Sequence, residues 1–376
     1  MASSPVVIPV DDKRHLRRFI DVPYRLYSKD PVWVPPLRSM ETAQFIPSKN
    51  PAFEFSRCRL FLALRDGRVT GRVAALVVDR ALERWNRRCG RIGWFECESD
   101  PESARLLLEA AEGWLAGQGM EEVSGPLGFT DNDPTGLVVE GFDETPTIAA
   151  GYNPPYYNDF LIANGYAKEV DYVEYRISVP AEIPERMRRM AELVRARTGV
   201  KVFSEKSRGT LAKRWGHQVF DVINEAYAEL YGTSLLSEKQ IRYYISNYLG
   251  QVDPEFIKLA SDGDRLVGFI IAMPNLSEAF RKARGRLLPF GVFHILRGMR
   301  KSRILDFYLA GVRKQYQNTG VDVLLSYEMA STALARGMEY AESNHELETN
   351  TKIQSMWKLF DRRLHRRARV YNKKLG

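Results

Sequence analysis

Hydrophobic and polar positions follow the same order twice along this chain. Each copy begins with two apolar, β-rich runs joined by an Asp-Gly turn, at Asp66-Gly67 within residues 60–78 and at Asp262-Gly263 within residues 256–273. Asp-Gly between two such runs is the strongest short-range signal for a β-hairpin. We therefore expect a hairpin at both places.

The elements predicted after each hairpin also correspond. After the first hairpin we expect a strand, an amphipathic helix, a strand, and later a helix with terminal strands, at 91–97, 101–117, 121–125 and 156–177. After the second we expect a strand, helix, strand, helix and final strand at 304–312, 319–336, 340–347, 350–360 and 366–371. This repeat favours two mixed α/β halves, each with a twisted mixed sheet flanked by helices. One larger irregular α/β domain is the alternative.

The predicted halves are residues 1–179 and 211–376, with a connecting amphipathic helix and linker at 180–210. One or two helices are expected to open the second half, within 211–249. The turn-rich segment 125–157 is too long for an ordinary connection and is typical of a functional or covering loop. A basic, aromatic-bearing insertion at 275–303 interrupts only the second half.

Composition narrows the class of protein. The 376 residues are 44% hydrophobic and 27% charged, as expected of a globular protein long enough for two domains. Three scattered cysteines predict reduced thiols, with neither a disulfide framework nor a metal site. No signal peptide and no apolar run of about 20 residues is present, which favours a cytoplasmic protein. The formal charge of +8 favours an anionic partner, such as a polyphosphate, an anionic lipid surface or nucleic acid.

The strand predicted at 304–312 ends in a polar, glycine-bearing turn just before a helix. Such a turn exposes backbone N–H groups at the positive end of the helix dipole, which suits a diphosphate. Its sequence resembles the pyrophosphate loop of the GCN5-related N-acetyltransferases (GNAT superfamily), with Lys314 and Asp322 at places where the family has a proline and a small residue. The resemblance implies a double-domain protein whose second half binds acyl-CoA as cosubstrate, without a metal or bound cofactor. The residues predicted to contact CoA are Leu309, Ala310, Gly311, Val312, Gln317, Asn318, Thr319, Gly320, Val321 and Asn350.

The equivalent turn of the first half has the opposite character. The strand at 91–97 is followed by Glu98-Ser99-Asp100-Pro101-Glu102, which is acidic and lacks glycine. Carboxylates at a helix N-terminus repel a diphosphate. The first half is therefore expected to bind no CoA and to shape the acceptor side instead.

Candidate catalytic residues lie on the strand that follows the CoA helix. An amine acceptor arrives protonated, so a general base must remove a proton before the amine attacks the thioester. Glu342 and His345 are the candidates, and the alternatives are a solvent-facing charged edge or, for His345, a polar core residue. Asn350 is expected to cap the next helix and, by the resemblance, to contact the pantetheine arm. Tyr371 is a distant substitute for the general acid, and N–H groups near 309–311 are expected to hold the thioester oxygen.

Three further stretches resemble the bacterial ceramide synthases and their uncharacterised relatives. These stretches are GPLGFTDND…GLVVEGFD…YNPPYY, the basic insertion and ESNHELETN. The resemblance implies transfer of a long-chain acyl group from acyl-CoA to the amine of a sphingoid base, in a ternary complex. Acceptor identity, acyl chain length and oligomeric state stay open.

The basic segment 281–303 suits an anionic membrane surface, such as the inner membrane, because each Lys or Arg near such a surface contributes about 1 kcal/mol. A solvated loop is the plain alternative for it. Rival functions are another GNAT N-acyltransferase acting on a small amine, an aminoacyl-tRNA-dependent peptidyltransferase, and a non-catalytic membrane-surface scaffold. No recognisable RNA-binding motif supports a nucleic-acid partner.

Overall fold

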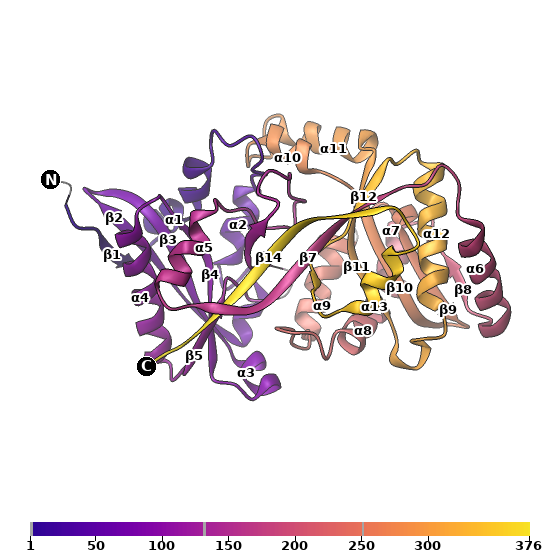
Figure 1. The fold of residues 1–376 in the computed structure, drawn as a ribbon, viewed down its shortest axis with the longest axis horizontal. Helices are drawn as coiled ribbons and strands as arrows, with labels where there is room; N and C mark the ends of the chain where they lie inside the picture. The colour runs from indigo at the N-terminus through magenta and orange to yellow at the C-terminus, as the bar shows by residue number, and fades with distance from the viewer. Residues whose placement is uncertain (1–2, 131–132, 250–251) are drawn as a thin grey trace. The chain divides into compact units, whose positions relative to one another are not determined.

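The computed structural model describes residues 3–130, 133–249 and 252–376, and two residues of the predicted 125–157 segment lie outside this range. The chain forms two compact units (Figure 1). Unit 1 comprises residues 1–173, 277–296 and 365–376, and unit 2 comprises residues 174–276 and 297–364. This division differs from the predicted halves because the chain passes between units inside strands β7 and β14 and inside helix α11.

Unit 1 contains a sheet flanked by helices. Its elements are β1 (Val6–Pro9), α1 (Lys13–Leu26), α2 (Arg38–Gln44), η1 (Pro51–Glu54), β2 (Ser56–Arg65), β3 (Arg68–Val78), α3 (Asp79–Trp85), β4 (Cys89–Cys97), α4 (Pro101–Gly117), β5 (Glu122–Gly125), β6 (Leu137–Glu140), α5 (Tyr156–Ala163), the start of β7 (Ala167–Ser178), α10 (Ser277–Ala283), the start of α11 (Gly291–Lys301) and the end of β14 (Arg362–Lys374). The strand order β1-β2-β3-β4-β5-β14 is antiparallel except for the parallel pair β4–β5.

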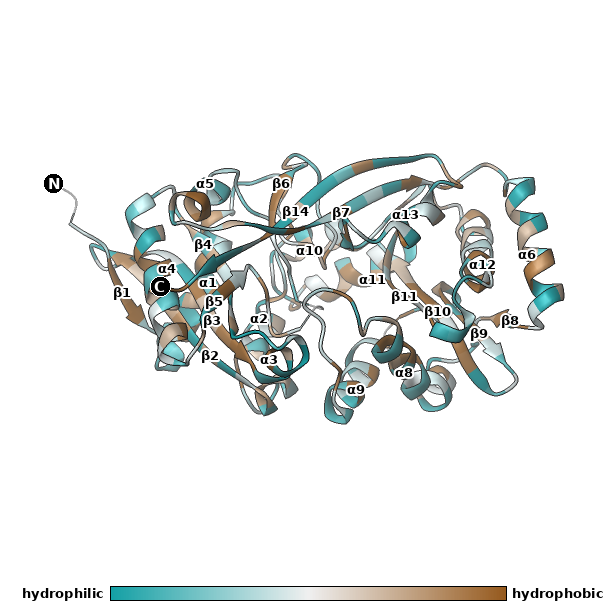
Figure 2. Cartoon of the chain, turned by 60° about the horizontal axis from the view of Figure 1, so that its bottom comes forward, coloured by the Kyte–Doolittle hydropathy of each residue, from teal (hydrophilic) through white to brown (hydrophobic). Residues whose placement is uncertain are grey.

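The first predicted hairpin is confirmed. Strands β2 and β3 pair from Ser56↔Val78 to Arg65↔Arg68, and both residues of the Asp66-Gly67 turn have positive φ. The side chains of β3 are almost all buried, and Figure 2 shows β2 and β3 as predominantly hydrophobic. Helix α4 covers this sheet with the apolar face that its sequence predicts, including Leu107 and Leu115.

Unit 2 repeats the arrangement. Its elements are the end of β7, α6 (Glu185–Thr198), β8 (Lys201–Phe203), α7 (Arg208–Thr210), η2 (Leu211–Trp215), α8 (Gly216–Ala226), α9 (Glu238–Tyr244), η3 (Ile245–Leu249), η4 (Pro254–Phe256), β9 (Ile257–Asp262), β10 (Arg265–Pro274), β11 (Ile304–Val312), η5 (Lys314–Tyr316), α12 (Val321–Ala335), β12 (Tyr340–Glu342), β13 (Glu346–Leu347) and α13 (Thr351–Trp357). The strand order is β7-β12-β11-β10-β9-β8.

Alternating side chains of the unit 2 strands form a core on each face of the sheet. Helix α8 packs on one face, against Leu259 and Phe269, and helix α12 packs on the other, against Ala260 and Ile270. This is the mixed sheet flanked by helices that the sequence predicts, and the hairpin around Gly263 is confirmed as β9 and β10.

The basic insertion does not pack where its place in the sequence suggests. We expected residues 275–303 to belong to the second half, but residues 277–296 fold against unit 1. The Ser277 hydroxyl donates to the Pro146 carbonyl over 2.7 Å, and the Arg38 N–H donates to the Gly285 carbonyl over 3.0 Å. Two helices, α10 and α11, form within the insertion.

Candidate active site

Strands β11 and β12 run side by side for only three residue pairs. They are parallel from Ile304↔Tyr340 to Asp306↔Glu342, and β12 ends there. On its other side β11 stays paired with β10 as far as Val312. The backbone of residues 307–312 therefore has one edge that β12 does not cover, at a gap in the sheet.

The predicted thioester-binding backbone lies along this edge. At Ala310 the N–H donates to the Tyr227 hydroxyl over 3.3 Å, and that hydroxyl donates to the Ala310 carbonyl over 3.0 Å. Tyr227 follows helix α8 and was not among the residues predicted from the sequence. Its hydroxyl shows that this strand edge accepts a polar group from outside the sheet.

The end of β11 leads into the predicted diphosphate loop. Asn318 and Gly320 both have positive φ, and helix α12 begins directly afterwards at Val321. The Gln317 side chain donates to the Val312 carbonyl over 3.2 Å, which ties the loop to the strand. The first-turn N–H groups of α12 have no carbonyl one turn earlier in the helix to bond with, so they suit an anion.

Gly320 is required at this turn for two reasons. Its φ of 92° lies in the left-handed region, which a side chain disfavours. A Cβ there would also lie 2.5 Å from Cγ2 of Val194 on helix α6. From the sequence we predicted that Gly320 lets a phosphate approach the backbone. In the structure this residue also packs closely against α6.

Lys314 and Asp322, the two residues that depart from the family's loop pattern, make different contacts. Lys314 forms an ion pair with Glu229 over 2.7 Å, and its N–H donates to Glu225 over 2.7 Å. Burial raises the pKa of Glu225, but the Lys314 backbone N–H and the Arg313 guanidinium lower it by more, so this pKa lies below its ordinary value. Asp322 lies in the first turn of α12, where its carbonyl accepts from Ser326 over 2.8 Å.

Buried carboxyl groups surround the point where β11 and β12 diverge. Glu174 of β7, Asp306 of β11, Glu342 of β12 and Glu346 of β13 are all less than 9% exposed. Desolvation raises the pKa of Glu346 to about 7 and that of Asp306 well above its ordinary value. Because these two groups hold their protons more strongly, the four carboxyl groups repel one another less.

His345 lies within this cluster. Its Nε2 is 2.6 Å from Oε1 of Glu174, and only 11% of the His345 side chain is exposed. Glu342 instead forms an ion pair with Arg176, with Nε and Oε1 2.9 Å apart. A histidine held by a buried carboxylate can accept a proton and have the resulting imidazolium stabilised.

The partners of His345 and Glu342 in this cluster were not among the residues predicted from the sequence. Glu174 and Arg176 lie on β7, far from His345 along the chain, and nothing local to them indicates the contact. Asp306 offered a signal, since it is the one charged residue in the otherwise uncharged strand ILDFYLAGV. A lone carboxyl in a buried strand is costly unless it has a partner, and Asn275 donates to it over 2.8 Å.

Asn350 is confirmed as the residue that caps α13, since its side chain accepts from the Ile353 N–H. Tyr371 is placed differently from the other candidates. It belongs to unit 1, where its side chain is buried in the core and its hydroxyl donates to Asn158 over 2.8 Å. Glu342 and His345 belong to unit 2. The buried position of Tyr371 gives no support for a role as general acid.

The equivalent turn of unit 1 is filled by ion pairs. Helix α4 begins at Pro101, and the adjacent Asp100 and Glu102 both bind Arg65 over 3.0 Å. Glu98 binds Arg68 over 2.6 Å. The acidic turn predicted from the sequence is thus present at this helix N-terminus.

The described residues 3–130, 133–249 and 252–376 include no helix long and apolar enough to cross a bilayer. Within the same residues, no group of three or more His, Cys, Asp or Glu side chains is arranged to hold a metal ion.

The chain is similar along nearly its whole length to two curated bacterial proteins. It is 29% identical over 382 residues to a bacterial ceramide synthase of Caulobacter vibrioides (strain NA1000 / CB15N), covering 98% of this chain and 97% of the relative. It is 26% identical over 377 residues to protein YghO of Escherichia coli (strain K12), covering 97% and 94%. No protein-family model matches the chain.

Solved structures show the same fold at low identity. A tandem GNAT protein from the clavulanic acid biosynthesis pathway aligns over 99% of both chains, with a TM-score of 0.57 and 10% identity. A GCN5-related N-acetyltransferase from Sphaerobacter thermophilus aligns over 99% of this chain and 96% of its own, with a TM-score of 0.51 and 12% identity. The protein therefore has the predicted tandem GNAT fold, and its likeness to a bacterial ceramide synthase supports its assignment as an N-acyltransferase.

Proposed function

We propose that this protein transfers a long-chain acyl group from acyl-CoA to the amine of a sphingoid base. The observation that carries the proposal is the gap between β11 and β12, with the His345–Glu174 pair at the point of divergence. Similarity to a bacterial ceramide synthase over 98% of the chain supports the choice of substrates.

Acyl-CoA binds along β11 and the loop that follows it in this proposal. The diphosphate contacts the N–H groups from Gln317 to Val321, where the α12 dipole favours negative charge. The Lys352 ammonium lies 3.4 Å from the Gln317 side-chain oxygen and adds positive charge beside the loop. The pantetheine arm and thioester extend along residues 309–312, and Asn350 at the start of α13 is proposed to contact the arm.

His345 acts as the general base, with Glu174 as its positioning partner. The acceptor ammonium loses a proton to His345, and the nitrogen lone pair attacks the thioester carbonyl carbon. The C–N bond forms, the C–S bond breaks, and the CoA thiolate leaves with the bonding electron pair. The second nitrogen proton passes to the thiolate or to solvent. A thiol pKa of about 8.5 makes the thiolate a good leaving group, so the step needs no dedicated acid.

Glu342 is the less suitable base of the two original candidates. Its carboxylate already accepts a hydrogen bond from the Arg176 guanidinium, so it is engaged in an ion pair within the sheet rather than presented to the acceptor amine. In the proposal this ion pair fixes the end of β12 next to β7, where Glu342 and Arg176 are also paired through the sheet.

A lipid acceptor places the reaction at a membrane surface. The basic segment 281–303 is proposed to contact an anionic leaflet, which fits a cytoplasmic protein bound peripherally to the inner membrane. Support comes from its exposed apolar side chains, including Leu288 at 76% and Phe290 at 71% exposure. Such residues beside basic ones are typical of interfacial helices.

The direct test incubates purified protein with a long-chain acyl-CoA and sphinganine in detergent micelles. We expect free CoA, measured with a thiol reagent, and N-acylsphinganine, measured by mass spectrometry, in equal amounts. The comparison reactions use acetyl-CoA with the same acceptor, and long-chain acyl-CoA with small amines. Faster turnover with a small amine would replace the sphingoid-base proposal with another GNAT acyltransfer.

Two variants test the assignment of the base. His345→Ala is expected to abolish most turnover, whereas Glu342→Gln retains more. The opposite ranking would make Glu342 the base. A non-catalytic scaffold would release no CoA with any of the acceptors. Activity that depends on tRNA would favour a peptidyltransferase. In the source cells, deletion of the gene should remove N-acylated long-chain bases from the lipids, and an unchanged lipid profile contradicts the proposal.

A further inference from the structure

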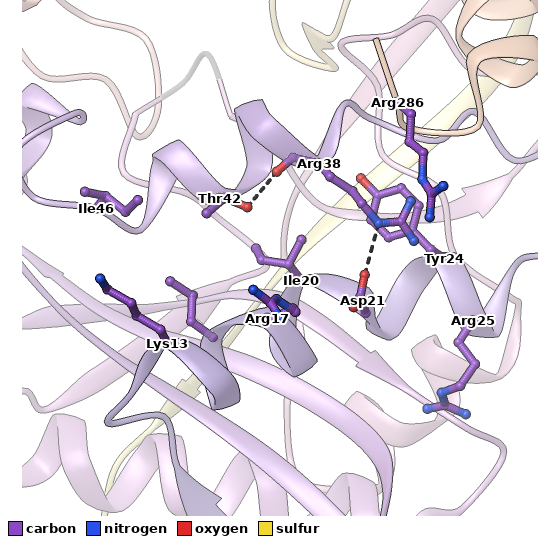
Figure 3. A pocket seen from close by; sticks show the side chains of 11 residues that line it. Lys13, Arg17, Ile20, Asp21, Tyr24, Arg25, Arg38, Thr42, Ile46 and Arg286 are labelled. Atoms are coloured by element: carbon purple, nitrogen blue, oxygen red, sulfur yellow. Dashed lines mark hydrogen bonds and ion pairs between the residues drawn. The ribbon is translucent and has the colours of Figure 1, made fainter. Parts of the chain in front are cut away.

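Unit 1 contains a cavity of about 850 Å³ with a strongly cationic lining (Figure 3). Helix α1, helix α2 and the segment just before α11 supply its walls. Five of its eleven lining side chains are cationic, and the only carboxylate is Asp21. The cationic side chains are Lys13, Arg17, Arg25, Arg38 and Arg286. Neither the acyl-CoA loop nor the His345–Glu174 pair contributes to this cavity.

The amino-acid spacing in α1 produces one wall of the cavity. Lys13, Arg17, Ile20 and Tyr24 are three or four residues apart and so share one face of the helix. The other face of α1 is apolar and packs into the core, with residues such as Phe19 fully buried. The cationic wall is therefore a consequence of the amphipathic sequence of α1.

Two of the cavity's arginines are neutralised within unit 1. Arg38 pairs with Asp21 over 3.0 Å, and its guanidinium carbon lies 3.5 Å from the centre of the Tyr24 ring. Arg25 forms an ion pair with Glu98. These contacts hold the walls in place but leave little charge for a ligand.

The other three cationic side chains of the cavity are not paired with a carboxylate of any described residue. Across the described parts of the chain, the Lys13, Arg17 and Arg286 side chains have no hydrogen bond or ion pair. All three are exposed and line the same cavity. Three uncompensated positive charges around one hollow suit a phosphate group, which offers several acceptor oxygens.

The chain that follows Arg286 is exposed and apolar. Within the ten residues 287–296, six large hydrophobic side chains are at least 38% exposed: Leu287, Leu288, Phe290, Val292, Phe293 and Leu296. The backbone is tightly folded here, since a Cβ on Gly291 would lie 1.9 Å from the Arg286 carbonyl oxygen. A firmly folded segment thus presents apolar side chains directly beside the cationic cavity.

We propose that this cavity binds the phosphate headgroup of an anionic phospholipid while the apolar side chains of 287–296 enter the adjacent acyl layer. Charge complementarity selects a phosphate, and the exposed apolar segment selects a phosphate that belongs to a lipid. This phosphate site rests on the proposed membrane contact of segment 281–303 and gives it a specific ligand. It does not depend on the acyl-transfer chemistry.

The test measures binding of the full chain to vesicles without acyl-CoA. Vesicles of phosphatidylglycerol mixed equally with phosphatidylcholine are compared with phosphatidylcholine alone, by flotation. Removing two cations with Arg17→Gln and Arg286→Gln is expected to weaken binding about 25-fold, since each charge contributes about fivefold. The matched control, Arg88→Gln with Arg105→Gln, removes the same charge from exposed unit 1 positions outside the cavity. We expect it to change binding far less, and equal losses would overturn the proposal.

A second pair of measurements separates a lipid phosphate from a soluble one. Leu288→Ser with Phe293→Ser should also weaken vesicle binding, because it removes the apolar contact. Inorganic phosphate and glycerol 1-phosphate are titrated against the protein by calorimetry as soluble probes. If either binds tightly in the cavity while vesicles do not bind, the lipid assignment is wrong. The His345→Ala variant should bind vesicles as the unchanged protein does, so failure of the proposed catalysis and failure of this site give different results.

Discussion

The strand that precedes the central helix ends differently in the two units. In unit 2, β11 ends in a loop with left-handed residues Asn318 and Gly320, and helix α12 begins directly afterwards at Val321. In unit 1, β4 ends in an acidic turn whose Asp100 and Glu102 are bound by Arg65. A few residues at one turn thus give the same fold a glycine-bearing helix start in unit 2 and an acidic, ion-paired one in unit 1.

The two units also differ in the gap between their parallel strands, which are β4 and β5 in unit 1 and β11 and β12 in unit 2. In unit 1 the Leu127 N–H donates to the Ile92 carbonyl over 2.7 Å, just beyond the last β4–β5 pair. A Cβ on Gly93 would lie 2.5 Å from the Leu127 carbonyl oxygen, so backbone fills this gap closely. In unit 2 a side chain rather than backbone reaches the corresponding edge of β11, since the Asn344 amide donates to the Tyr308 carbonyl over 3.4 Å. Part of the predicted covering segment 125–157 therefore closes the strand gap of unit 1.

The largest expected effect comes from removing His345, the proposed base of unit 2. His345→Ala should lower kcat about 10²–10⁴-fold, which is the usual contribution of a general base. Glu174→Gln should lower it less while preserving the shape of the side chain. The measurement is CoA release at saturating substrates. Glu98→Gln in unit 1 is the control, and an equal loss in that variant would contradict the assignment of catalysis to unit 2.

The buried carboxyl groups of unit 2 predict a dependence of stability on pH. Burial raises the pKa of Glu346 from 4.5 to about 7, so the folded state binds the extra proton and loses stability as pH rises through this range. Glu346→Gln should remove this loss, which amounts to about 3 kcal/mol in the unfolding free energy. Urea unfolding between these pH values measures the effect. Glu83→Gln, at an exposed position of unit 1, should leave the slope unchanged.

A smaller effect is expected from a substitution at Gly320 of unit 2, which can be compared with one at Gly67 of unit 1. Gly320→Ala should weaken acyl-CoA binding about tenfold, since a left-handed conformation costs a side chain about 1–2 kcal/mol and Val194 lies close. Gly67→Ala in unit 1 has a similar φ of 74° with open space around the added Cβ. It should lower stability without changing acyl-CoA affinity. Adding Val194→Ala to Gly320→Ala should recover part of the affinity, and no recovery would leave backbone strain as the whole cause.

The smallest effect is expected at the acidic turn of unit 1. Glu98→Gln with Asp100→Asn should change the Kd for acyl-CoA by less than about twofold, because these residues belong to unit 1 and already form ion pairs there. Calorimetry with the unchanged protein as reference measures this. A marked gain of a second binding event would show that the carboxylates alone had closed a CoA site.

Several elements follow from the sequence because their determinants are local. The predicted strand at 304–312 and helix at 101–117 match β11 and α4 residue for residue. The two Asp-Gly hairpins form, and Asn350 caps α13 as expected. Turn chemistry, capping and helical periodicity act within a few residues, so the sequence shows them directly.

The predicted strand at 340–347 shows where local information ends. It forms two short pieces, β12 and β13, with His345 between them. The break is accompanied by contacts with β7: the Ser343 N–H donates to the Tyr175 carbonyl over 2.8 Å, and the Ser343 hydroxyl accepts from the Tyr175 N–H over 2.9 Å. Alternating side chains predict a strand but not which neighbour interrupts it.

The sequence by itself determined the repeated α/β order, the glycine-bearing loop after β11 and the acidic turn after β4. The tertiary structure decided that Glu174 faces His345, that Tyr371 lies in the core of unit 1, and that the basic insertion completes a cationic cavity beside α1. Loops and turns depend on the conformational preferences of a few adjacent residues. Pairs of distant residues depend on strand pairing and burial, which are settled only when the whole chain packs.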